Sequence, residues 1–402
     1  MQLILFCGMT AIAGVLSAPV TILEPAPLLE PRQGTTIPGK YIVKMKDASG
    51  QDTINLALKL LNKPADQVYR IGVFQGFAAA LSDSDVQKLR QMPTVQHIEK
   101  DARFKADWAG DHVEVLQKRT LTGQSAPSWG LGRISNLNSA NFAYTYDDSA
   151  GAGTCSYVID TGIYTAHPDF GGRATFLANF AGDGSNNDGH GHGTHVAGTL
   201  GSKTYGVAKK TKLYAVKVLS NTGVGTTSGV IAGINFAVND SRSRACPKGA
   251  VANLSLAGSK SASLDTAVAR AVATGLMVVA GAGNAAADAS NTSPASEASA
   301  FTVGATDIYD RFASFSNFGP VVDILAPGVS ILSTSNTGGT EFRSGTSMAT
   351  PHVAGLAAYL LGLEGTMAPS ALAARIQALA QKGRIAGVPS GTTNLLINNG
   401  IK

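Results

Sequence analysis

The sequence predicts an α/β protein in which a mostly parallel sheet carries helices on both faces, preceded by a small α+β domain. Two observations support this prediction. Over roughly the last 280 residues, short apolar strands alternate with helical stretches, which is the order of βαβ units. Ahead of them, a segment of about 70 residues follows the order βαββαβ, which is typical of a ferredoxin-like domain.

The overall composition is that of a chain that folds around a core. The chain has 402 residues, which corresponds to two or three domains at about 150 residues each. Apolar residues make up 44% and glycines number 46, so a disordered chain, a coiled coil and a collagen-like repeat are excluded. The net charge of +5 comes from scattered Lys and Arg without a basic stripe, so we expect no nucleic-acid partner.

The first residues carry the pattern of a secretory signal peptide. Residues 3–16 are mostly apolar or small, and the run ends at Ser17-Ala18-Pro19, a small-residue cleavage site. The run is short for a bilayer span, and no later segment has about 18 apolar residues in succession, so we expect no membrane partner. A buried N-terminal helix is the alternative. The pattern predicts a signal peptide over residues 1–18 and a secreted, extracellular protein.

The three cysteines fit this location. Cys7 lies in the predicted signal peptide, which leaves Cys155 and Cys246 as an even pair in a secreted chain. That pair indicates one disulfide bond, and two buried free thiols are the alternative. No CxxC pair is present, so a structural zinc site is not favoured.

The N-terminal domain is expected between Gly39 and Asp107, after a Pro-rich lead over residues 19–38 that we expect to be flexible. Its helix over residues 83–92 has Ser82 as a candidate N-cap. Its strands are expected at residues 40–45, 68–74, 76–81 and 95–99, and its other helix at residues 54–61.

The C-terminal region is expected to form the large, mostly parallel sheet. Its strands are expected at residues 156–159, 212–219, 251–256, 276–280, 301–303 and 321–325. Its helices are expected at residues 192–200, 227–238, 263–274, 350–363 and 370–379.

The first of four segments that carry chemistry ends in a carboxylate. The apolar strand at Val158-Ile159 runs into Asp160, which is followed by Thr161-Gly162. Reactive groups in an open parallel sheet gather beyond the carboxyl ends of the strands, so Asp160 lies where a functional acid would lie. Taken alone, the pattern favours an Asp that forms a turn or a cap.

The second segment contains His190, His192 and His195. His192 and His195 are three positions apart and could share one helix face as metal ligands. The absence of an HExxH pattern and of a nearby Cys weakens that interpretation. The other interpretation is a general base in the first turn of a helix.

The third and fourth segments supply a hydroxyl and an amide. Pro351 is tolerated in the first turn of a helix, which predicts a helix start near Met348 and places Ser347 at its positive end. The N–H of Ser347 could then face a developing oxyanion, although a plain N-cap is the alternative. A strand that ends near Gly283 is followed by Asn284, whose side-chain amide could also donate to an oxyanion; taken alone, Gly-Asn is a turn.

Together these segments fill the four roles of nucleophilic catalysis. A hydroxyl (Ser347) needs a base (His192), the base needs a carboxylate (Asp160), and the intermediate needs donors (Asn284). The chain order Asp, His, Ser differs from the Ser, Asp, His order of α/β-hydrolases, and no GxSxG surrounds Ser347.

At these residues the sequence resembles the subtilases, and within them the secreted fungal enzymes of the proteinase K type. The resemblance covers the chain beyond Trp129 and rests on residues 158–162, 192–198, 283–284 and 345–355. It implies a three-layer subtilisin-like fold and a serine endopeptidase with Asp160, His192 and Ser347 as its triad and Asn284 as its oxyanion donor. His190 and His195 match no catalytic position of the family and are interpreted as local structure.

The N-terminal domain resembles the subtilase propeptide, which assists folding and inhibits the protease. The resemblance implies a zymogen with a propeptide over residues 19–119, a catalytic domain over residues 120–402 and the chain's own propeptide as an inhibitory partner. The maturation cut is expected in the polar linker between Arg119 and Ala126, and a dibasic site at Lys118-Arg119 is the alternative. A permanent accessory domain is the other interpretation of the small domain.

The resemblance also implies two walls of a substrate cleft. One wall is Ser255, Leu256, Ala257 and Gly258, and the other is Gly223, Val224 and Gly225, where a peptide would add as a strand. These residues are small or apolar and none is acidic, so we expect broad cleavage of proteins and peptides after apolar and aromatic residues.

A structural calcium ion is a further implication, and none is expected in catalysis. Asp323 matches a family ligand, with the carbonyls of Ala298 and Ala300 beside it, and a plain surface Asp is the alternative. Cys155 and Cys246 match one family disulfide, whereas Phe301 stands at a position of the second, which is missing.

Three sequons predict glycosylation at Asn239, Asn291 and Asn253. Asn253 lies in an expected buried strand and is the weakest candidate, whereas Asn239 at a helix end is the best. We expect a monomer. The rival functions are a narrow-specificity processing protease, which acidic pocket residues would mark, and a binding protein on an inactive protease fold, which a broken triad would mark.

Overall fold

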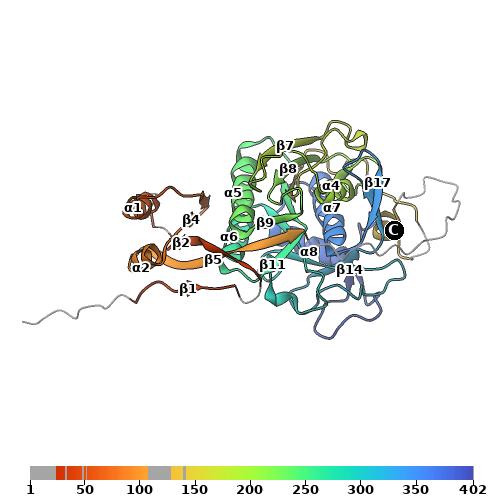
Figure 1. The fold of residues 1–402 in the computed structure, drawn as a ribbon. Helices are drawn as coiled ribbons and strands as arrows, with labels where there is room; N and C mark the ends of the chain where they lie inside the picture. The colour runs from red at the N-terminus through yellow and green to blue at the C-terminus, as the bar shows by residue number, and fades with distance from the viewer. Residues whose placement is uncertain are drawn as a thin grey trace, which may run out of the picture.

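The computed structural model describes residues 24–31, 34–47, 49–50, 52–106, 128–138 and 142–401 (Figure 1). The predicted signal peptide, the linker and both candidate maturation sites lie outside the described residues. Within the described part, no helix is both long and apolar enough to cross a membrane.

The N-terminal domain has the predicted βαββαβ order. Its strand order β5-β2-β4-β3 is antiparallel throughout, as in ferredoxin-like domains. Its elements are β2 (Thr36–Met45), α1 (Asp52–Leu61), β3 (Gln67–Ile71), β4 (Phe74–Ala80), α2 (Asp83–Arg90) and β5 (Val95–Ala106). Ser82 caps α2 as predicted, because its hydroxyl accepts from the Asp85 N–H and the Asp85 carboxylate accepts from the Ser82 N–H.

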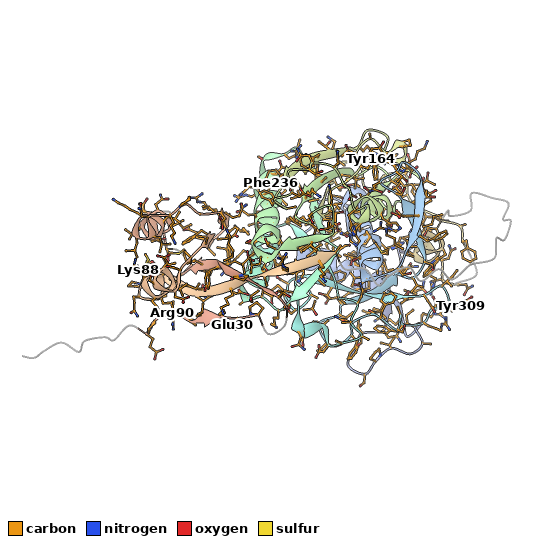
Figure 2. The ribbon with its side chains drawn as sticks, in the orientation of Figure 1. Glu30, Lys88, Arg90, Tyr164, Phe236 and Tyr309 are labelled. Atoms are coloured by element: carbon orange, nitrogen blue, oxygen red, sulfur yellow. A yellow bond between two sulfur atoms is a disulfide. The ribbon has the colours of Figure 1, made fainter. Side chains whose placement is uncertain are left out.

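Two expectations for this domain are wrong. The Pro-rich lead is not wholly a flexible segment, because β1 (Leu28–Leu29) pairs in parallel with β5. Glu30 next to β1 accepts a hydrogen bond from Lys100 of β5 at 2.6 Å. Figure 2 shows Glu30 at the lower edge of the N-terminal domain. The last strand also continues well past the expected end at Glu99 and reaches Ala106.

The sheet of the N-terminal domain lies between two sets of helices. Residues that alternate along β2 face opposite ways: Tyr41 and Val43 pack with α1 and α2, whereas Ile42 joins the core formed with α5 (Thr227–Ser243) and α6 (Ala262–Ala273). The N-terminal domain therefore docks onto α5 and α6 through a shared apolar core. On its outer side, α2 exposes Lys88 (Figure 2).

The C-terminal region forms a nine-stranded sheet of order β18-β19-β15-β14-β12-β10-β6-β8-β7. All neighbours are parallel except β18 and β19. The strands are β6 (Cys155–Asp160), β7 (Ala174–Asn179), β8 (Lys212–Lys217), β10 (Ala250–Leu254), β12 (Met277–Gly281), β14 (Phe301–Thr306), β15 (Ile324–Pro327), β18 (Gln381–Lys382) and β19 (Leu395–Leu396).

Helices cover both faces of this sheet, which confirms the three-layer prediction. Along β6, Val158 packs into the core with α4, α7 and α8, whereas Tyr157 and Ile159 pack into the core with α5 and α6. The remaining helices are α3 (Trp129–Ser135), α4 (His192–Gly201), α7 (Thr346–Glu364), α8 (Pro369–Leu379) and the short η1 (Pro168–Phe170) and η2 (Ala289–Asn291).

The strand expected at residues 251–256 is in fact two strands. β10 ends at Leu254, and after Ser255 the chain enters β11 (Leu256–Ser259), which leaves the main sheet. β11 joins β5 and β13 (Thr292–Ser293), and β9 (Val224–Thr226) also pairs with β5. A separate hairpin consists of β16 (Ile331–Thr334) and β17 (Thr340–Arg343).

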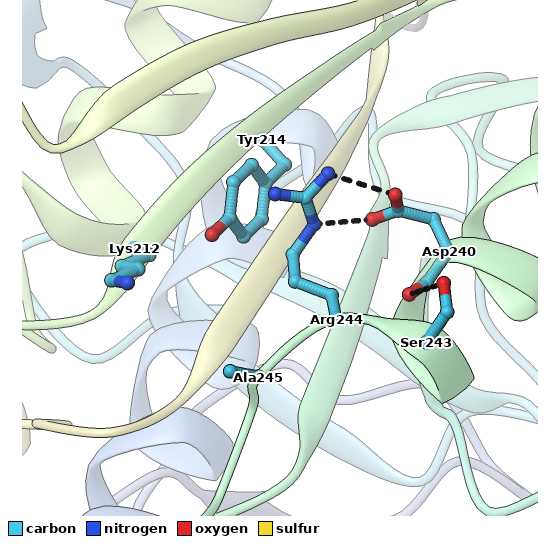
Figure 3. A pocket seen from close by; sticks show the side chains of 6 residues that line it. All are labelled: Lys212, Tyr214, Asp240, Ser243, Arg244 and Ala245. Carbon is cyan, nitrogen blue, oxygen red and sulfur yellow. Dashed lines mark hydrogen bonds and ion pairs between the residues drawn. The ribbon is translucent and has the colours of Figure 1, made fainter.

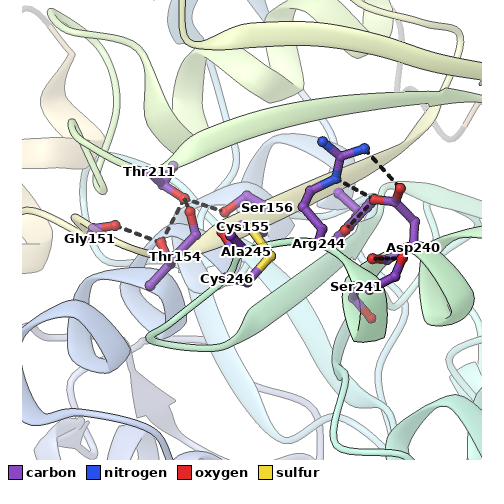
Figure 4. The surroundings of a disulfide bond; sticks show 12 residues. Gly151, Thr154, Cys155, Ser156, Thr211, Asp240, Ser241, Arg244, Ala245 and Cys246 are labelled. Carbon is purple, nitrogen blue, oxygen red and sulfur yellow. Dashed lines mark hydrogen bonds and ion pairs between the residues drawn. A yellow bond between two sulfur atoms is a disulfide. The ribbon is translucent and has the colours of Figure 1, made fainter.

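The predicted disulfide bond is present. Cys155 at the start of β6 joins Cys246, which follows α5, with an S–S distance of 1.97 Å and Cα atoms 5.5 Å apart (Figure 4). Beside it, the hydroxyls of Thr154 and Ser156 both lie within hydrogen-bond distance of the Thr211 hydroxyl. The bond fixes the amino end of β6 to the segment after α5.

Candidate active site

The two predicted walls of the cleft bracket an extended strand. The carboxyl half of β5 pairs antiparallel with β9 on one side, where Phe104 lies opposite Gly225, and with β11 on the other, where Ala106 lies opposite Leu256. The Ala106 N–H also donates to the Gly223 carbonyl at 2.8 Å. In Figure 1, β5 runs from the N-terminal domain into the body of the C-terminal region between β9 and β11. The two stretches thus hold an extended strand by strand addition, and that strand belongs to this chain's own N-terminal domain.

The side chain of Phe104 fills part of the cleft. It is buried against Gly258, where an added Cβ atom would lie only 2.4 Å from the ring. The absence of a side chain at position 258 therefore makes room for a large aromatic group of the bound strand.

Asp160 and His192 meet where β6 ends and α4 begins. Asp160 is the last residue of β6, His192 is the first of α4, and His192 Nδ1 lies 2.7 Å from Asp160 Oδ1. Both side chains are fully buried. A carboxylate on Nδ1 holds the proton of the neutral ring on that atom, so Nε2 is free to accept one. Among the described residues, Nε2 has no hydrogen-bond partner.

Ser347 lies in the first turn of α7 and is locked to Ser255. Its hydroxyl donates to the Ser255 carbonyl at 3.1 Å, and the Ser255 hydroxyl donates to the Ser347 carbonyl at 2.9 Å. The helix start predicted near Met348 is wrong, because α7 begins at Thr346 and Pro351 lies inside it. Pro351 has no N–H to offer the Ser347 carbonyl, and the Ser255 hydroxyl takes that place.

Asn284 is oriented by a hydrogen bond to the first turn of α7. Its Oδ1 accepts from the N–H of Thr346, the residue before Ser347, at 2.8 Å. This bond fixes which amide atom is which, so the other end of the group presents Nδ2. Nδ2 is buried and has no partner within the described part of the chain. An aligned donor without a ground-state partner is what an oxyanion site requires.

The structure separates the other histidines from this cluster. His195 Nε2 lies 2.9 Å from the Ile331 carbonyl and 3.2 Å from the Glu341 carbonyl, so it carries a proton and cannot bind a metal. Burial lowers the pKa of His195 to about 3. The ring of His190 lies 6.2 Å from that of His192, and burial lowers its pKa too.

Asp323 is placed just before β15 and is largely buried. Its Oδ2 accepts from the Thr302 N–H at 2.7 Å, and burial raises the pKa of its carboxyl to about 6. No group of three or more His, Cys, Asp and Glu that could hold a metal occurs among the described residues. A cation at Asp323 would therefore take its other ligands from carbonyl oxygens, such as those of Ala298 and Ala300.

The sequons differ in exposure. Asn239 on α5 and Asn291 on η2 are exposed. Asn253 is fully buried in β10, and its amide donates to the Ser255 hydroxyl at 2.9 Å, so it is inaccessible in the folded protein. This burial disfavours glycosylation at Asn253, which stays the weakest of the three candidates.

Several polar residues that the sequence analysis did not single out lie at this site or at the domain interface. Glu99 accepts from the Ser263 N–H at the start of α6, and Asp101 accepts from the Ser228 N–H at the start of α5. Burial raises the pKa of both carboxyls. Each carboxylate caps a helix of the other domain, where the helix dipole favours negative charge. Their only sequence signal was a pair of carboxylates two positions apart in a strand.

A recess at the amino ends of the strands lies away from this cluster, which is at their carboxyl ends. It starts at Lys212, the first residue of β8, whereas Asp160 ends the adjacent parallel strand. The Arg244 guanidinium lies 4.4 Å from the Tyr214 ring centroid and binds Asp240 at 2.6 Å (Figure 3). The volume of the recess is about 420 Å³, and its lining residues are Lys212, Tyr214, Asp240, Ser243, Arg244 and Ala245.

Comparisons with known proteins agree with this geometry. Residues 151–394 match the subtilase family and residues 40–107 match the peptidase inhibitor I9 family. The chain is 51% identical over 395 residues to a cuticle-degrading protease of Metarhizium anisopliae, covering 98% of each chain. It is 49% identical to proteinase R of Parengyodontium album, covering 94% of this chain and 92% of that one.

A solved structure also resembles the fold. The crystal structure of a cold adapted subtilisin-like serine proteinase superposes with a TM-score of 0.64 at 44% identity, covering 67% of this chain and 97% of that chain. The cleft, the domain order and both family matches lead to one conclusion. The chain belongs to the subtilase family of serine proteases and carries an I9 inhibitor propeptide ahead of its catalytic domain.

Proposed function

We propose that Ser347, His192 and Asp160 form the catalytic triad and that Asn284 is the oxyanion donor. The single observation that carries this proposal is the 2.7 Å contact between Asp160 and His192, because it leaves Nε2 as the basic atom of a buried imidazole. The neighbouring placement of Ser347 and Asn284 at the start of α7 supplies the other two roles.

The reaction is acyl transfer. His192 Nε2 removes the Ser347 proton as the hydroxyl oxygen attacks the scissile carbonyl, and Asp160 stabilises the resulting imidazolium. Asn284 Nδ2 and the positive end of α7 stabilise the oxyanion. The imidazolium then protonates the leaving amine, and a water molecule releases the acyl group by the same steps in reverse.

The substrates that we propose are proteins and peptides, cut after apolar and aromatic residues. Strand addition between Gly223–Gly225 and Ser255–Gly258 recognises the backbone, which tolerates many sequences. No acidic side chain occurs in these two stretches to select a basic residue. A peptide library read by mass spectrometry tests this, and a profile dominated by Arg or Lys before the cut would contradict it.

We further propose that the chain is secreted, that residues 19–119 are its propeptide, and that Asn239 and Asn291 are glycosylated. The apolar N-terminal run, the disulfide bond and the exposure of these two asparagines support the proposal. The secreted protein's N-terminus, read by Edman sequencing, distinguishes a cut between Arg119 and Ala126 from a dibasic cut at Lys118-Arg119.

A structural calcium ion is proposed at Asp323. Calcium prefers carboxylate and carbonyl oxygens, and Asp323 with the carbonyls of Ala298 and Ala300 offers that set. The ion would neutralise a largely buried carboxylate and join the loop before β14 to β15. In the inactive Ser347→Ala background, a chelator should lower the thermal midpoint, and Asp323→Asn should remove that difference; an unchanged midpoint without calcium would contradict the site.

The deciding experiment compares the wild-type precursor with Ser347→Ala. We expect the wild type to release its propeptide and hydrolyse an apolar peptide anilide, and the variant to remain an inert, full-length precursor. A variant that is processed but inactive would assign maturation to another protease. Equal hydrolysis by both proteins would remove Ser347 from the mechanism.

A further inference from the structure

We propose that Asp188, acting through the hydroxyl of Thr161, is a positioning residue that sets His192 against Asp160. The inference rests on the proposed function, because it assigns His192 as the base. Neither Asp188 nor Thr161 belongs to the triad, and the argument comes from the hydrogen bonds that connect them to it.

Asp188 is a buried carboxylate whose hydrogen bonds go to the start of α4 and to Thr161. It is 4% exposed and lies three residues before the N-cap of α4. Oδ1 accepts from the Gly191 N–H at 2.8 Å, the His190 N–H at 3.2 Å and the Thr161 hydroxyl at 2.8 Å. Oδ2 accepts from the N–H of Thr194 at 2.8 Å and from its hydroxyl at 2.6 Å.

These bonds replace a cap that α4 lacks. The N-cap residue is Gly191, which has no side chain to accept the orphan N–H groups of the first turn. A side chain there would be crowded, because an added Cβ atom would lie 2.9 Å from Nη2 of Arg343, and the φ of 87° disfavours other residues. Asp188 therefore holds the turn that begins with His192.

Thr161 connects this cap to the strand that carries Asp160. Since a carboxylate only accepts, the Thr161 hydroxyl must donate its proton to Asp188. Its lone pair then accepts from the Gly193 N–H at 2.9 Å, and the Thr161 N–H donates to Asp160 Oδ1 at 2.7 Å. One residue thus touches the acid, the turn after the base and the cap.

The first turn of α4 packs so closely against the turn after β6 that a small change there should displace His192. An added Cβ atom at Gly193 would lie 2.1 Å from the Gly162 carbonyl, so the first turn of α4 already lies against the turn after β6. Without the Thr161 hydroxyl, the imidazole–carboxylate bond would have to carry more of the alignment between the end of β6 and the start of α4. A small displacement of a reacting group can cost about 10²-fold in rate.

Asp188 also supplies charge. The positive end of α4 disfavours an imidazolium at His192, and a carboxylate at that end offsets the effect. Four other charged or titratable groups lie around His192. They are Asp160 at the end of β6, His190 before α4, His195 on α4 and Arg343 on β17, whose guanidinium donates to the His190 carbonyl. Removing the Asp188 charge should therefore make the imidazolium that forms at His192 during the reaction less favourable.

The test uses Thr161→Val, which keeps the shape and removes the hydroxyl, and Asp188→Asn, which keeps the size and removes the charge. We expect kcat for a peptide anilide to fall by about 10²-fold in each with KM nearly unchanged. Only Asp188→Asn should move the acid limb of the kcat/KM profile to lower pH. Thr161→Ser should restore most of the loss, and the two main variants should not be additive when combined.

A matched control is Thr199→Val, a buried threonine of the same helix whose hydroxyl reaches only the His195 carbonyl. It should keep wild-type activity. If Asp188→Asn fails to fold, the kcat of Thr161→Val still tests the inference, and its thermal midpoint shows whether that variant is folded. Wild-type kcat and an unshifted pH profile in Thr161→Val and Asp188→Asn, beside an inactive Ser347→Ala, would overturn the inference alone. An active Ser347→Ala would overturn the proposed function.

Discussion

At the scale of single residues, Asn284 has two amide atoms with separate contacts. Oδ1 holds the Thr346 N–H, and Nδ2 is the buried donor. We predict that Asn284→Ala lowers kcat by about 10²–10³-fold with little change in KM, because the donor acts on charge that develops in the transition state. Steady-state kinetics on a peptide anilide measures this.

The variant Asn284→Asp separates the two contacts. It keeps an acceptor for Thr346 and replaces the donor by an oxygen, so its loss should be at least as large as that of Asn284→Ala. If either variant retained kcat to within about threefold of the wild type, another group would have to stabilise the oxyanion.

Lys217 is the second residue with a specific prediction. Its side chain is fully buried, and Nζ donates to the carbonyls of Thr161 and Leu219, both at 2.8 Å, and lies 3.3 Å from Asp183. We predict that Lys217→Met lowers the free energy of unfolding by about 3–5 kcal/mol, because two carbonyls and a carboxylate lose their partner. Urea unfolding in the Ser347→Ala background measures it.

An exposed lysine is the control for this prediction. Lys210 forms an ion pair with Asp148, a side chain that is 94% exposed. Lys210→Met should therefore change the free energy of unfolding by less than about 1 kcal/mol. A comparable effect of the two substitutions would show that burial of Lys217 is not what matters.

The residues of the proposed site were predictable in unequal measure. Asp160, His192, Ser347 and Asn284 each follow an apolar strand or begin a helix in a recognisable segment. Asp188 was not predicted, because its contacts reach across loops and an Asp before a glycine resembles a turn. Lys217 ends a strand and its charge gives no sign of burial.

At the scale of elements, β5 is where prediction from sequence is weakest. The strand was expected to stop at Glu99, and the residues that follow include the charged Lys100, Arg103 and Lys105. In the structure these residues continue the strand into the cleft, where backbone pairing with β9 and β11 needs no apolar pattern. Hydrophobic periodicity detects burial of side chains and misses a strand held by its backbone.

The position of His97 on β5 gives a pH-dependent prediction. His97 is buried at the domain interface, its Nε2 lies 3.1 Å from the Ser263 hydroxyl, and burial, followed by the nearby Lys44 charge, lowers its pKa from 6.5 to about 4. The unfolded chain therefore binds this proton first. The His97 contribution to stability is present above pH 6.5 and is lost as the pH falls toward 4, at up to about 1.4 kcal/mol per pH unit.

The measurement is the free energy of unfolding of the Ser347→Ala precursor between pH 7.5 and about 4.5, with and without His97→Gln. Because the raised pKa values of Glu99 and Asp101 act in the opposite direction in both proteins, the difference between the two curves isolates His97. Parallel curves across this range would show that His97 does not titrate on unfolding.

At the scale of the whole molecule, the order of the two domains was predictable and their docking was not. The βαββαβ and βαβ patterns each require only local periodicity. The interface depends on Glu99 and Asp101, which are polar in the sequence and buried in the structure because each meets a helix start of the other domain. The hydrophobic pattern of one domain does not reveal which of its polar residues the other domain will bury.

The disulfide bond acts on this larger scale. Cys155 and Cys246 are 91 positions apart, so the bond closes a long loop that contains β6, β7 and β8 of the nine-stranded sheet. We predict that a Cys155→Ser/Cys246→Ser variant in the Ser347→Ala background loses about 2–5 kcal/mol of stability, chiefly because the unfolded chain gains freedom. Denaturant unfolding with and without a reducing agent checks this, and the reductant should affect only the parent protein.

The way β5 occupies the cleft has a practical consequence for engineering. Along Phe104, Lys105 and Ala106, the partners in register on β9 and β11 are backbone groups, and only the Phe104 ring fills a shaped space. An inhibitor held in this way is recognised by its extended form and one anchor. We therefore expect propeptides to be exchangeable between relatives as modules, and a weaker or tighter graft to set how soon the enzyme becomes active without changing a residue of the protease.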